Sequence, residues 1–182
     1  PDGTLFVDLF GGSGLLSHIT KSLKPHSTVI YNDFDNYRFR MKHIPQTNQL
    51  LADIREMVGN SVPRHKIIKG ELRERIFSRI EQEENSTGYV DFITLSSSIL
   101  FSMKYKLSVQ DMRKEALYNN IRKTGYPECT DYLEGLEIVS CDYKEVFNRY
   151  KDIPGVVFLV DPPYLSTDVG TYNMYWNMAD YL

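Results

Sequence analysis

Cysteine is scarce in this sequence: only Cys129 and Cys141 occur among its 182 residues. Two cysteines form no disulfide framework, and neither stands at a metal-ligand spacing. The histidines are equally scattered, so we expect no metal site; they are His18, His26, His43 and His65. No apolar run approaches the roughly 18 residues that a membrane span needs, and no signal-peptide pattern opens the chain. These absences predict a cytoplasmic protein, and a 42% hydrophobic composition is enough for one sizeable core.

Positive charge is also in short supply, because 21 Lys and Arg residues face 24 Asp and Glu residues, for a net charge of −3. This balance argues mildly against binding to nucleic acid, which usually requires a basic surface. The basic residues nevertheless gather in two stretches, which are Arg64, His65, Lys66, Lys69, Arg73, Arg75 and Arg79, and then Lys104, Lys106, Arg113, Lys114, Arg122 and Lys123. Two interpretations stay open: a surface that contacts DNA, or solvated helix faces of mixed charge diluted by Glu71, Glu74 and residues 81–84.

The most informative motif follows an apolar run at residues 155–160, which predicts a strand. This run leads into Asp161-Pro162-Pro163-Tyr164. Proline fixes φ and lacks an N–H group, so the turn is stiff, and the Asp161 carboxylate and Pro162 carbonyl can point into a cleft. These two acceptors would localise the lone pair of an aromatic exocyclic amine and stabilise its developing charge, while Tyr164 stacks on the base. The motif favours methyl transfer to such an amine; an ordinary strand-end turn is the alternative.

A second motif lies near the start of the chain, where residues 4–7 are a predicted strand that runs into Asp8. The tight turn that follows contains Gly11, Gly12 and Gly14. Glycines permit a sharp turn and let backbone N–H groups approach a ligand closely. The spacing differs from G-x-G-x-x-G and the motif lacks the lysine of a phosphate-binding loop, which argues against hydride transfer and ATP hydrolysis. A helix is predicted next, because Leu15, Ile19 and Leu23 recur at helical spacing. A purely structural turn is the alternative.

Two further acids follow predicted strands. Residues 28–32 are β-branched and end at Asp33, some 25 residues beyond Asp8, where an acid can bind the ribose hydroxyls of an adenosine-containing cofactor. We favour Asp33 over Asp35, which lies two residues past the strand end. Residues 136–139 form another short strand that could present Asp142 to the adenine amine of the cofactor. Asp142 could equally cap a helix over residues 143–150.

In these segments the chain resembles the Dam-like DNA adenine-N6 methyltransferases of phages and bacteria. The matching segments are Phe6-Val-Asp-Leu-Phe-Gly-Gly-Ser-Gly14, Val29-Ile-Tyr-Asn-Asp33, Val139-Ser-Cys-Asp-Tyr143 and Val160-Asp-Pro-Pro-Tyr164. The resemblance implies an α/β, Rossmann-like fold that uses S-adenosylmethionine and acts on double-stranded DNA with a flipped adenine. It implies a cofactor site formed by Asp8, Phe10, Gly11, Gly12, Gly14, Asp33, Asp142, Tyr143 and Asp161. It also implies a catalytic role for Asp161, Pro162, Pro163 and Tyr164, in a bacterial cell or phage-infected host.

The resemblance also predicts how the chain is organised. Residues 1–40 and 133–182 are expected to form the catalytic core, and residues 41–132 a mostly helical insertion where relatives keep their target-recognition region. Relatives carry a segment before the glycine strand and further strands after Asp-Pro-Pro-Tyr, so we expect a fragment with an incomplete sheet. The DNA-reading segment of the family, rich in Arg, Asn and Gly, is not recognisable in residues 101–110. Residues 166–173 could form a lid, with Tyr172, Tyr175 and Trp176 available for base stacking.

Within the insertion, the sequence makes several local predictions. Leu72, Ile76, Phe77 and Ile80 form an apolar helical stripe, and residues 83–88 are the clearest loop. Residues 89–103 are apolar enough for a buried helix or a strand. Ser108, with Asp111 three residues later, predicts a capped helix that carries Val109, Met112 and Ile121.

Three other functions remain open from the sequence. A ribosomal-RNA guanine-N2 methyltransferase can carry the same Asp-Pro-Pro-Tyr motif, but such enzymes tend to lack the large insertion that separates Asp8 from Asp161 here. A cytosine-N4 methyltransferase more often begins the motif with Ser. An inactive fragment that keeps a cofactor pocket or a DNA-binding surface is the third alternative.

Overall fold

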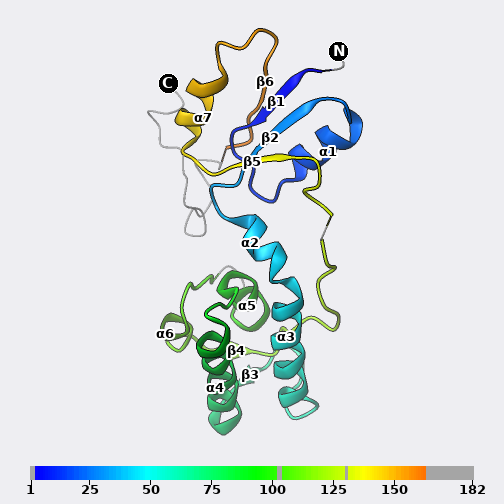
Figure 1. The fold of residues 1–182 in the computed structure, drawn as a ribbon. Coiled ribbons are helices and arrows are strands. Elements are labelled where there is room, and N and C mark those ends of the chain that lie inside the picture. Colours follow the sequence, from blue (N-terminus) through cyan, green and yellow to red (C-terminus); the bar gives the residue numbers. More distant parts are fainter. Residues whose placement is uncertain (1–2, 102–103, 130, 163–182) are drawn as a thin grey trace. The chain divides into compact units, whose positions relative to one another are not determined.

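The computed structural model describes residues 3–101, 104–129 and 131–162. The chain divides into two compact units. The first, which we call the sheet unit, combines residues 1–42 with residues 129–182, and the second, the helical unit, comprises residues 43–128. Their elements are labelled in Figure 1. Within the described ranges, no helix is long and apolar enough to cross a membrane.

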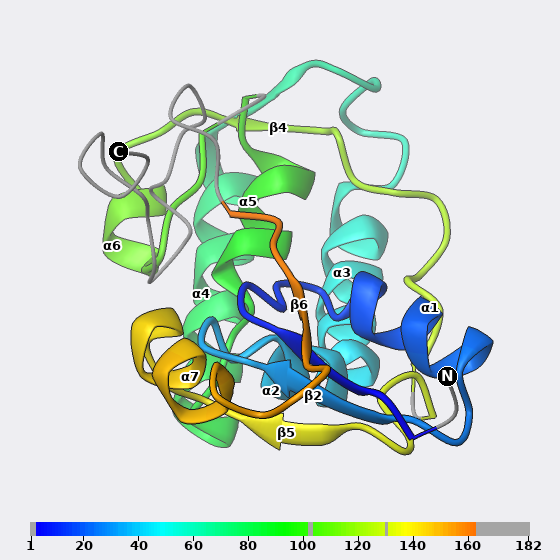
Figure 2. The ribbon, with the colours of Figure 1, turned by 90° about the horizontal axis from the view of Figure 1, so that it is seen from above.

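Among its described residues, the sheet unit contains four parallel strands. They are β1 (Leu5–Asp8), β2 (Thr28–Asn32), β5 (Glu137–Val139) and β6 (Val157–Leu159), in the order β5-β2-β1-β6. Val7 of β1 is paired with Ile30 of β2 and with Phe158 of β6. Figure 2 shows β6 beside β1 although some 150 residues of chain separate them. A parallel sheet with intervening helices confirms the predicted α/β class.

Helices connect these strands on both sides of the sheet. Helix α1 (Leu15–Leu23) joins β1 to β2, and α7 (Tyr143–Tyr150) joins β5 to β6. The two connections run in opposite directions across the sheet, so right-handed crossovers place the helices on opposite faces, as Figure 1 shows. On the α7 face, Val7, Leu9, Ile30 and Val146 form the buried core.

The α1 helix is where its apolar spacing predicted it, but the stripe itself is not buried. Leu15, Ile19 and Leu23 are 54%, 44% and 73% exposed. The buried residue of this helix is Ser17, which faces the sheet. The short helix α2 (Tyr37–Lys42) follows β2 and buries no side chain among the residues that the structure describes.

The helical unit is built around four helices and a short ribbon. The helices are α3 (Ile44–Val58), α4 (Gly70–Thr87), α5 (Phe92–Ile99) and α6 (Val109–Met112). Strands β3 (Ile67–Ile68) and β4 (Leu117–Tyr118) pair in antiparallel fashion. The predicted stripe on α4 is buried, because Ile76, Phe77 and Ile80 have no exposed surface and Leu72 packs beside them. Residues 89–103 were predicted to form a buried helix or a strand, and residues 92–99 of this segment form a helix.

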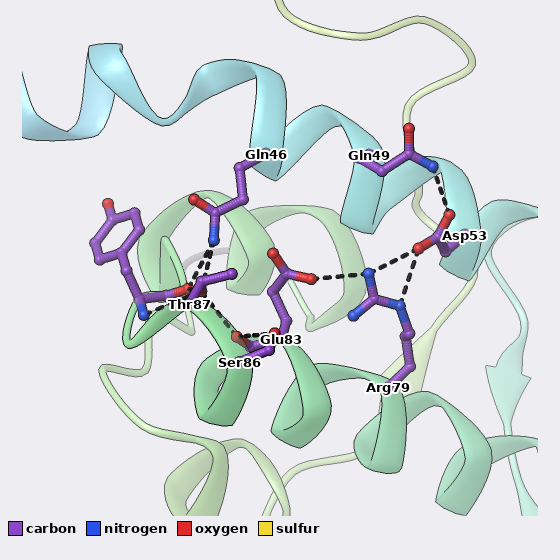
Figure 3. A network of polar contacts seen from close by, with 8 residues as sticks. Gln46, Gln49, Asp53, Arg79, Glu83, Ser86 and Thr87 are labelled. Carbon is purple, nitrogen blue, oxygen red and sulfur yellow. Dashed lines mark hydrogen bonds and ion pairs between the residues drawn. The ribbon is translucent and has the colours of Figure 1, made fainter.

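The predicted loop at residues 83–88 was wrong, because α4 continues to Thr87 and ends at Gly88 with φ of 74°. An ion-pair network accounts for the difference (Figure 3). Arg79 lies 2.8 Å from both Glu83, one helical turn later, and Asp53 of α3. The Thr87 hydroxyl also donates a hydrogen bond to the Glu83 carbonyl. The ion pair of Glu83 and the hydrogen bond of the Thr87 hydroxyl therefore stabilise this polar stretch as a helix.

The predicted cap at Ser108 is present, but the helix that it starts is short. The Ser108 hydroxyl accepts a hydrogen bond from the Asp111 amide at 3.2 Å. Helix α6 ends at Met112, and Ile121 lies beyond β4 in an irregular segment, so its predicted helical position was wrong. Ile121 is still buried in the core of the helical unit.

Candidate active site

The predicted site residues of the sheet unit converge because its four strands are parallel. Asp8 ends β1, Asp33 follows β2, Asp142 follows β5 and Asp161 follows β6. The carboxyl ends of parallel strands meet at one edge of the sheet, so these acids share that edge. Backbone bonds tie the segments beyond the strands together. The Leu9 amide donates to the Leu159 carbonyl at 3.1 Å, and the Asp33 amide donates to the Val139 carbonyl at 2.8 Å.

The strand order places a topological switch point between β1 and β6. From β1 the chain crosses to β2 on one side, whereas β6 lies on the other side of β1. Ligands of open α/β sheets bind outside the carboxyl ends of the strands at such a point. Asp8 and Asp161 follow or end the two strands that flank it. Asp161 is exposed, and Pro162 is partly buried. Pro163, Tyr164 and the predicted lid with Tyr172, Tyr175 and Trp176 lie outside the described residues.

Asp8 is a buried acid, with 1% of its surface exposed. Its Oδ2 accepts a hydrogen bond from the Ser17 hydroxyl of α1 at 2.7 Å. Its Oδ1 is buried and has no hydrogen-bond partner within the described part of the chain. Burial raises the pKa of Asp8, the Ser17 hydroxyl opposes that shift, and repulsion from the Asp161 carboxylate adds to it.

The glycine turn packs against Tyr31 of β2. A Cβ atom on Gly11 would stand 2.3 Å from Tyr31 Cε2 and 2.7 Å from the Asn32 carbonyl oxygen, so glycine alone fits there. Gly12 and Gly14 have φ of 48° and 78°, a region that favours glycine. The buried Tyr31 hydroxyl donates to the Gly12 carbonyl at 2.7 Å. The turn thus has a fixed shape that is set by the neighbouring strand.

The Asp33 carboxylate is engaged in contacts within the protein that the sequence did not predict. Its Oδ1 accepts a hydrogen bond from the Tyr37 amide, and its Oδ2 accepts one from the Arg38 amide. Its Oδ1 also lies 3.1 Å from the Tyr31 hydroxyl, whose single proton is shared with the nearer Gly12 carbonyl. The carboxylate therefore holds the first turn of α2 against β2. Only 4% of Asp33 is exposed. Contact with a ribose is not tested by these bonds and stays a prediction.

Asp142 caps helix α7, as one of the two sequence interpretations predicted. Its Oδ1 accepts a hydrogen bond from the Lys144 amide at 2.8 Å. Beside it, the Tyr143 ring lies 4.8 Å from the Phe10 ring, centroid to centroid. This aromatic pair joins the glycine turn to the start of α7. The predicted contact between Asp142 and a cofactor adenine stays a prediction.

Sequence reasoning missed Asn32, which ends β2 and is 1% exposed. Its Nδ2 donates to the Leu9 carbonyl at 3.0 Å and to the Cys141 carbonyl at 2.9 Å. Its Oδ1 accepts a hydrogen bond from the Cys141 amide at 3.0 Å. One side chain therefore clamps the segments that follow β1 and β5. A polar residue closing an apolar strand was the signal that could have identified it.

The edge of the sheet combines a shaped glycine turn, several fixed carboxylates and one exposed carboxylate followed by prolyl carbonyl groups. The turn and the acids of β2 and β5 are suited to an adenosine-like group, whose amine and hydroxyls donate hydrogen bonds. Asp161 is suited to accept a hydrogen bond from an amine that arrives from solvent. Among the described residues, no cluster of His, Cys, Asp and Glu is arranged to hold a metal ion.

The family model of the D12 class N6 adenine-specific DNA methyltransferases matches residues 1–181. A Haemophilus influenzae protein named "Putative methyltransferase" is 38% identical over 183 residues, which cover 100% of this chain and 61% of the relative. The chain thus spans less than two thirds of the length of that relative. No solved structure matches the chain.

Proposed function

Because the chain belongs to the D12 class N6 adenine-specific DNA methyltransferase family, we propose that the protein transfers the methyl group of S-adenosylmethionine to N6 of adenine in DNA. The observation that carries the proposal is the position of Asp161. It follows β6 at the switch point of the sheet, next to the strand that leads into the glycine turn. An amine-orienting group and a cofactor-binding turn belong on adjacent strands in such an enzyme.

The residues at the sheet edge fit S-adenosylmethionine. Gly11, Gly12 and Gly14 would border the cofactor, since glycines in such a turn let backbone N–H groups approach a ligand closely. When bound, the cofactor supplies an electrophilic methyl group on a sulfonium centre. Asp33 would accept a hydrogen bond from its ribose, because a carboxylate has about four acceptor positions and the Tyr37 and Arg38 amides occupy two of them, with the Tyr31 hydroxyl beside a third.

The remaining members of the proposed cofactor site are Asp8, Phe10 and two residues that follow β5, Asp142 and Tyr143. The second oxygen of Asp142 would accept from the cofactor adenine amine, beside the aromatic pair formed by Phe10 and Tyr143. The buried Oδ1 of Asp8 lacks a donor among the described residues. We assign Asp8 to the polar end of the same site, between the glycine turn and Asp161.

Asp161 and Pro162 would orient the target amine. The lone pair of adenine N6 is delocalised into the ring, so the amine is a poor nucleophile. The Asp161 carboxylate accepts one N6 hydrogen and the Pro162 carbonyl accepts the other, which favours a tetrahedral nitrogen and stabilises the positive charge that develops on it. Holding the nitrogen in line with the methyl group supplies much of the acceleration.

The substrate is proposed to be double-stranded DNA with the adenine flipped out of the helix. Extrusion costs a few kcal/mol, which hydrogen bonds to the base edge and stacking would offset. Tyr164 is the ring that the sequence places next to Asp161 for this purpose. The helical unit, inserted between β2 and β5, is the proposed target-recognition region.

Methyl transfer from labelled S-adenosylmethionine to unmethylated DNA tests the role of Asp161. We expect Asp161→Ala to abolish transfer while weakening cofactor binding far less, as measured by calorimetric titration. Asp152→Ala is the matched control, because Asp152 is an exposed acid of the same unit that precedes β6. Equal transfer rates for the wild type and Asp161→Ala would overturn the assignment.

A further inference from the structure

The cations of the helical unit fall into two groups according to their partners. Six of those on α4 and in the segments that flank α6 are paired with carboxylates at 3.0 Å or less: Arg73, Arg79, Lys104, Lys106, Arg113 and Lys114. Figure 3 shows Arg79 held between two such acids. These side chains are neutralised within the fold, so they are poor candidates for binding an external anion.

Four other arginines form no ion pair with a carboxylate among the described residues: Arg55, Arg64, Arg75 and Arg122. Three of them, Arg55, Arg64 and Arg122, meet at one short segment. Arg55 Nε donates to the Arg122 carbonyl, and Arg64 Nη1 donates to the Ile121 carbonyl, both at 2.8 Å. The guanidinium of Arg122 lies 4.2 Å from the centroid of the Tyr126 ring. We call Arg55, Arg64 and Arg122 the arginine cluster.

The short ribbon of β3 and β4 brings the members of the cluster together. The His65 amide donates to the Asn119 carbonyl, and the Asn119 amide donates to the Lys66 carbonyl, both at 2.9 Å. These bonds place Arg64 opposite the start of the segment that carries Arg122. Arg55 comes from the last turn of α3. Arg64 and Arg122 are exposed, and Arg55 is partly buried.

The cluster places three like charges on one short segment with no carboxylate ion pair in the described chain. Each guanidinium is held by a main-chain carbonyl or an aromatic ring, and each keeps several N–H donors beyond the bonds described. A planar, pre-positioned guanidinium suits the paired oxygens of a phosphate better than a lysine does. Several such groups on one surface favour a partner with repeated phosphates.

We propose that the arginine cluster binds the phosphodiester backbone of double-stranded DNA. The choice of DNA rests on the proposed function, whereas the choice of phosphate rests on the cluster itself. A protein with a net charge of −3 needs a local basic surface to hold a polyanion. The cluster provides one in the helical unit, separate from the residues that orient the amine. Such contacts strengthen binding to DNA of any sequence and carry no base readout.

The salt dependence of DNA binding tests this proposal. Fluorescence anisotropy of a labelled duplex, titrated over a range of NaCl concentrations, gives the slope of log K against log[salt]. Each phosphate contact contributes about 0.9 to that slope. We expect the combined variant Arg55→Gln, Arg64→Gln and Arg122→Gln to lower its magnitude by about 2 to 3, and equally for two duplexes of unrelated sequence.

Two further variants keep the test decisive. Lys114→Gln removes one exposed charge that is already paired with Asp111, so its slope should match the wild type. Arg122→Gln alone should lower the slope by about 0.9, and it removes no hydrogen bond made by its side chain to the described fold. A combined-variant slope equal to that of Lys114→Gln would overturn the proposal. So would a loss confined to one sequence, or a slope change seen with RNA but not with duplex DNA.

The outcome is separable from that of the proposed function. A protein that binds DNA with the expected slope change but transfers no methyl group would refute the enzymatic assignment and leave the arginine cluster as a DNA contact. Normal methylation with unchanged slopes in the variants would refute the role of the cluster alone.

Discussion

Replacing Asn32 with Asp tests whether this single amide holds the edge of the sheet together. The substitution keeps the size and shape of the side chain and keeps an oxygen that can accept from the Cys141 amide. It removes the NH₂ group that donates to the carbonyl oxygens of Leu9 and Cys141. In its place, the second carboxyl oxygen of the new aspartate faces the carbonyl oxygens of Leu9 and Cys141 in a site that is almost wholly buried.

The expected cost follows from the two carbonyl groups that lose their donor. A buried polar group left without a partner costs about 1–3 kcal/mol, so the pair predicts a loss of about 2–6 kcal/mol. That is a large share of the roughly 5–15 kcal/mol by which a domain is stable. Burial beside two carbonyls also raises the pKa of the introduced carboxyl in the folded state. The defect should therefore grow as pH rises above about 4, because the protonated form is the one that the fold tolerates.

Hydrogen exchange measured by mass spectrometry locates the effect. A loss of 2 kcal/mol corresponds to exchange that is about 30-fold faster. We expect at least this acceleration at neutral pH in peptides that cover residues 5–14 and 137–146. Peptides from residues 44–99 should be unaffected and serve as an internal reference. Asn148→Asp, at an exposed position of α7, is the control for the added charge. Exchange in Asn32→Asp equal to that in the control would refute the clamp.

Gly11→Ala should destabilise the protein by about 1–3 kcal/mol and weaken cofactor binding, because its Cβ would stand 2.3 Å from the ring of the buried Tyr31. An unchanged thermal midpoint and cofactor affinity would show that the turn can yield. Asp8→Asn should flatten the pH dependence of stability. The raised pKa of Asp8 makes folding less favourable as pH rises from about 4, through the pKa of the folded state, and the amide lacks that contribution. Thermal unfolding between pH 4 and pH 7 measures this effect, and identical profiles for the two proteins would contradict it.

The strand-end motifs were predictable because each combines a local backbone signal with a chemical one. β-Branched residues at 28–32 became β2, and the start and end predicted for α7 match the structure at Tyr143 and Tyr150. Asp142 illustrates the limit of such reasoning. Its capping bond lies within two residues of sequence and could be anticipated, whereas a cofactor contact depends on segments that fold from far along the chain.

Features that depend on distant partners could not be read from the sequence. The strands β3 and β4 have two residues each, too few to show alternation, and they pair across nearly 50 residues of chain. Glu83 lies in a polar stretch that we predicted as a loop, and its ion pair with Arg79 one turn earlier favours the helix instead. The two basic stretches looked alike in sequence, and each contains cations that are paired with carboxylates. Only the fold distinguishes these from Arg64 and Arg122, which form no ion pair with a carboxylate in the described chain.

Product identification tests the central claim most directly. Double-stranded DNA without methylation and ribosomal RNA are incubated separately with the protein and labelled S-adenosylmethionine, digested to nucleosides and resolved by mass spectrometry. The account predicts label in N6-methyladenine from DNA alone, and none from Asp161→Ala. Label in N4-methylcytosine, or in N2-methylguanine from the RNA, would contradict it.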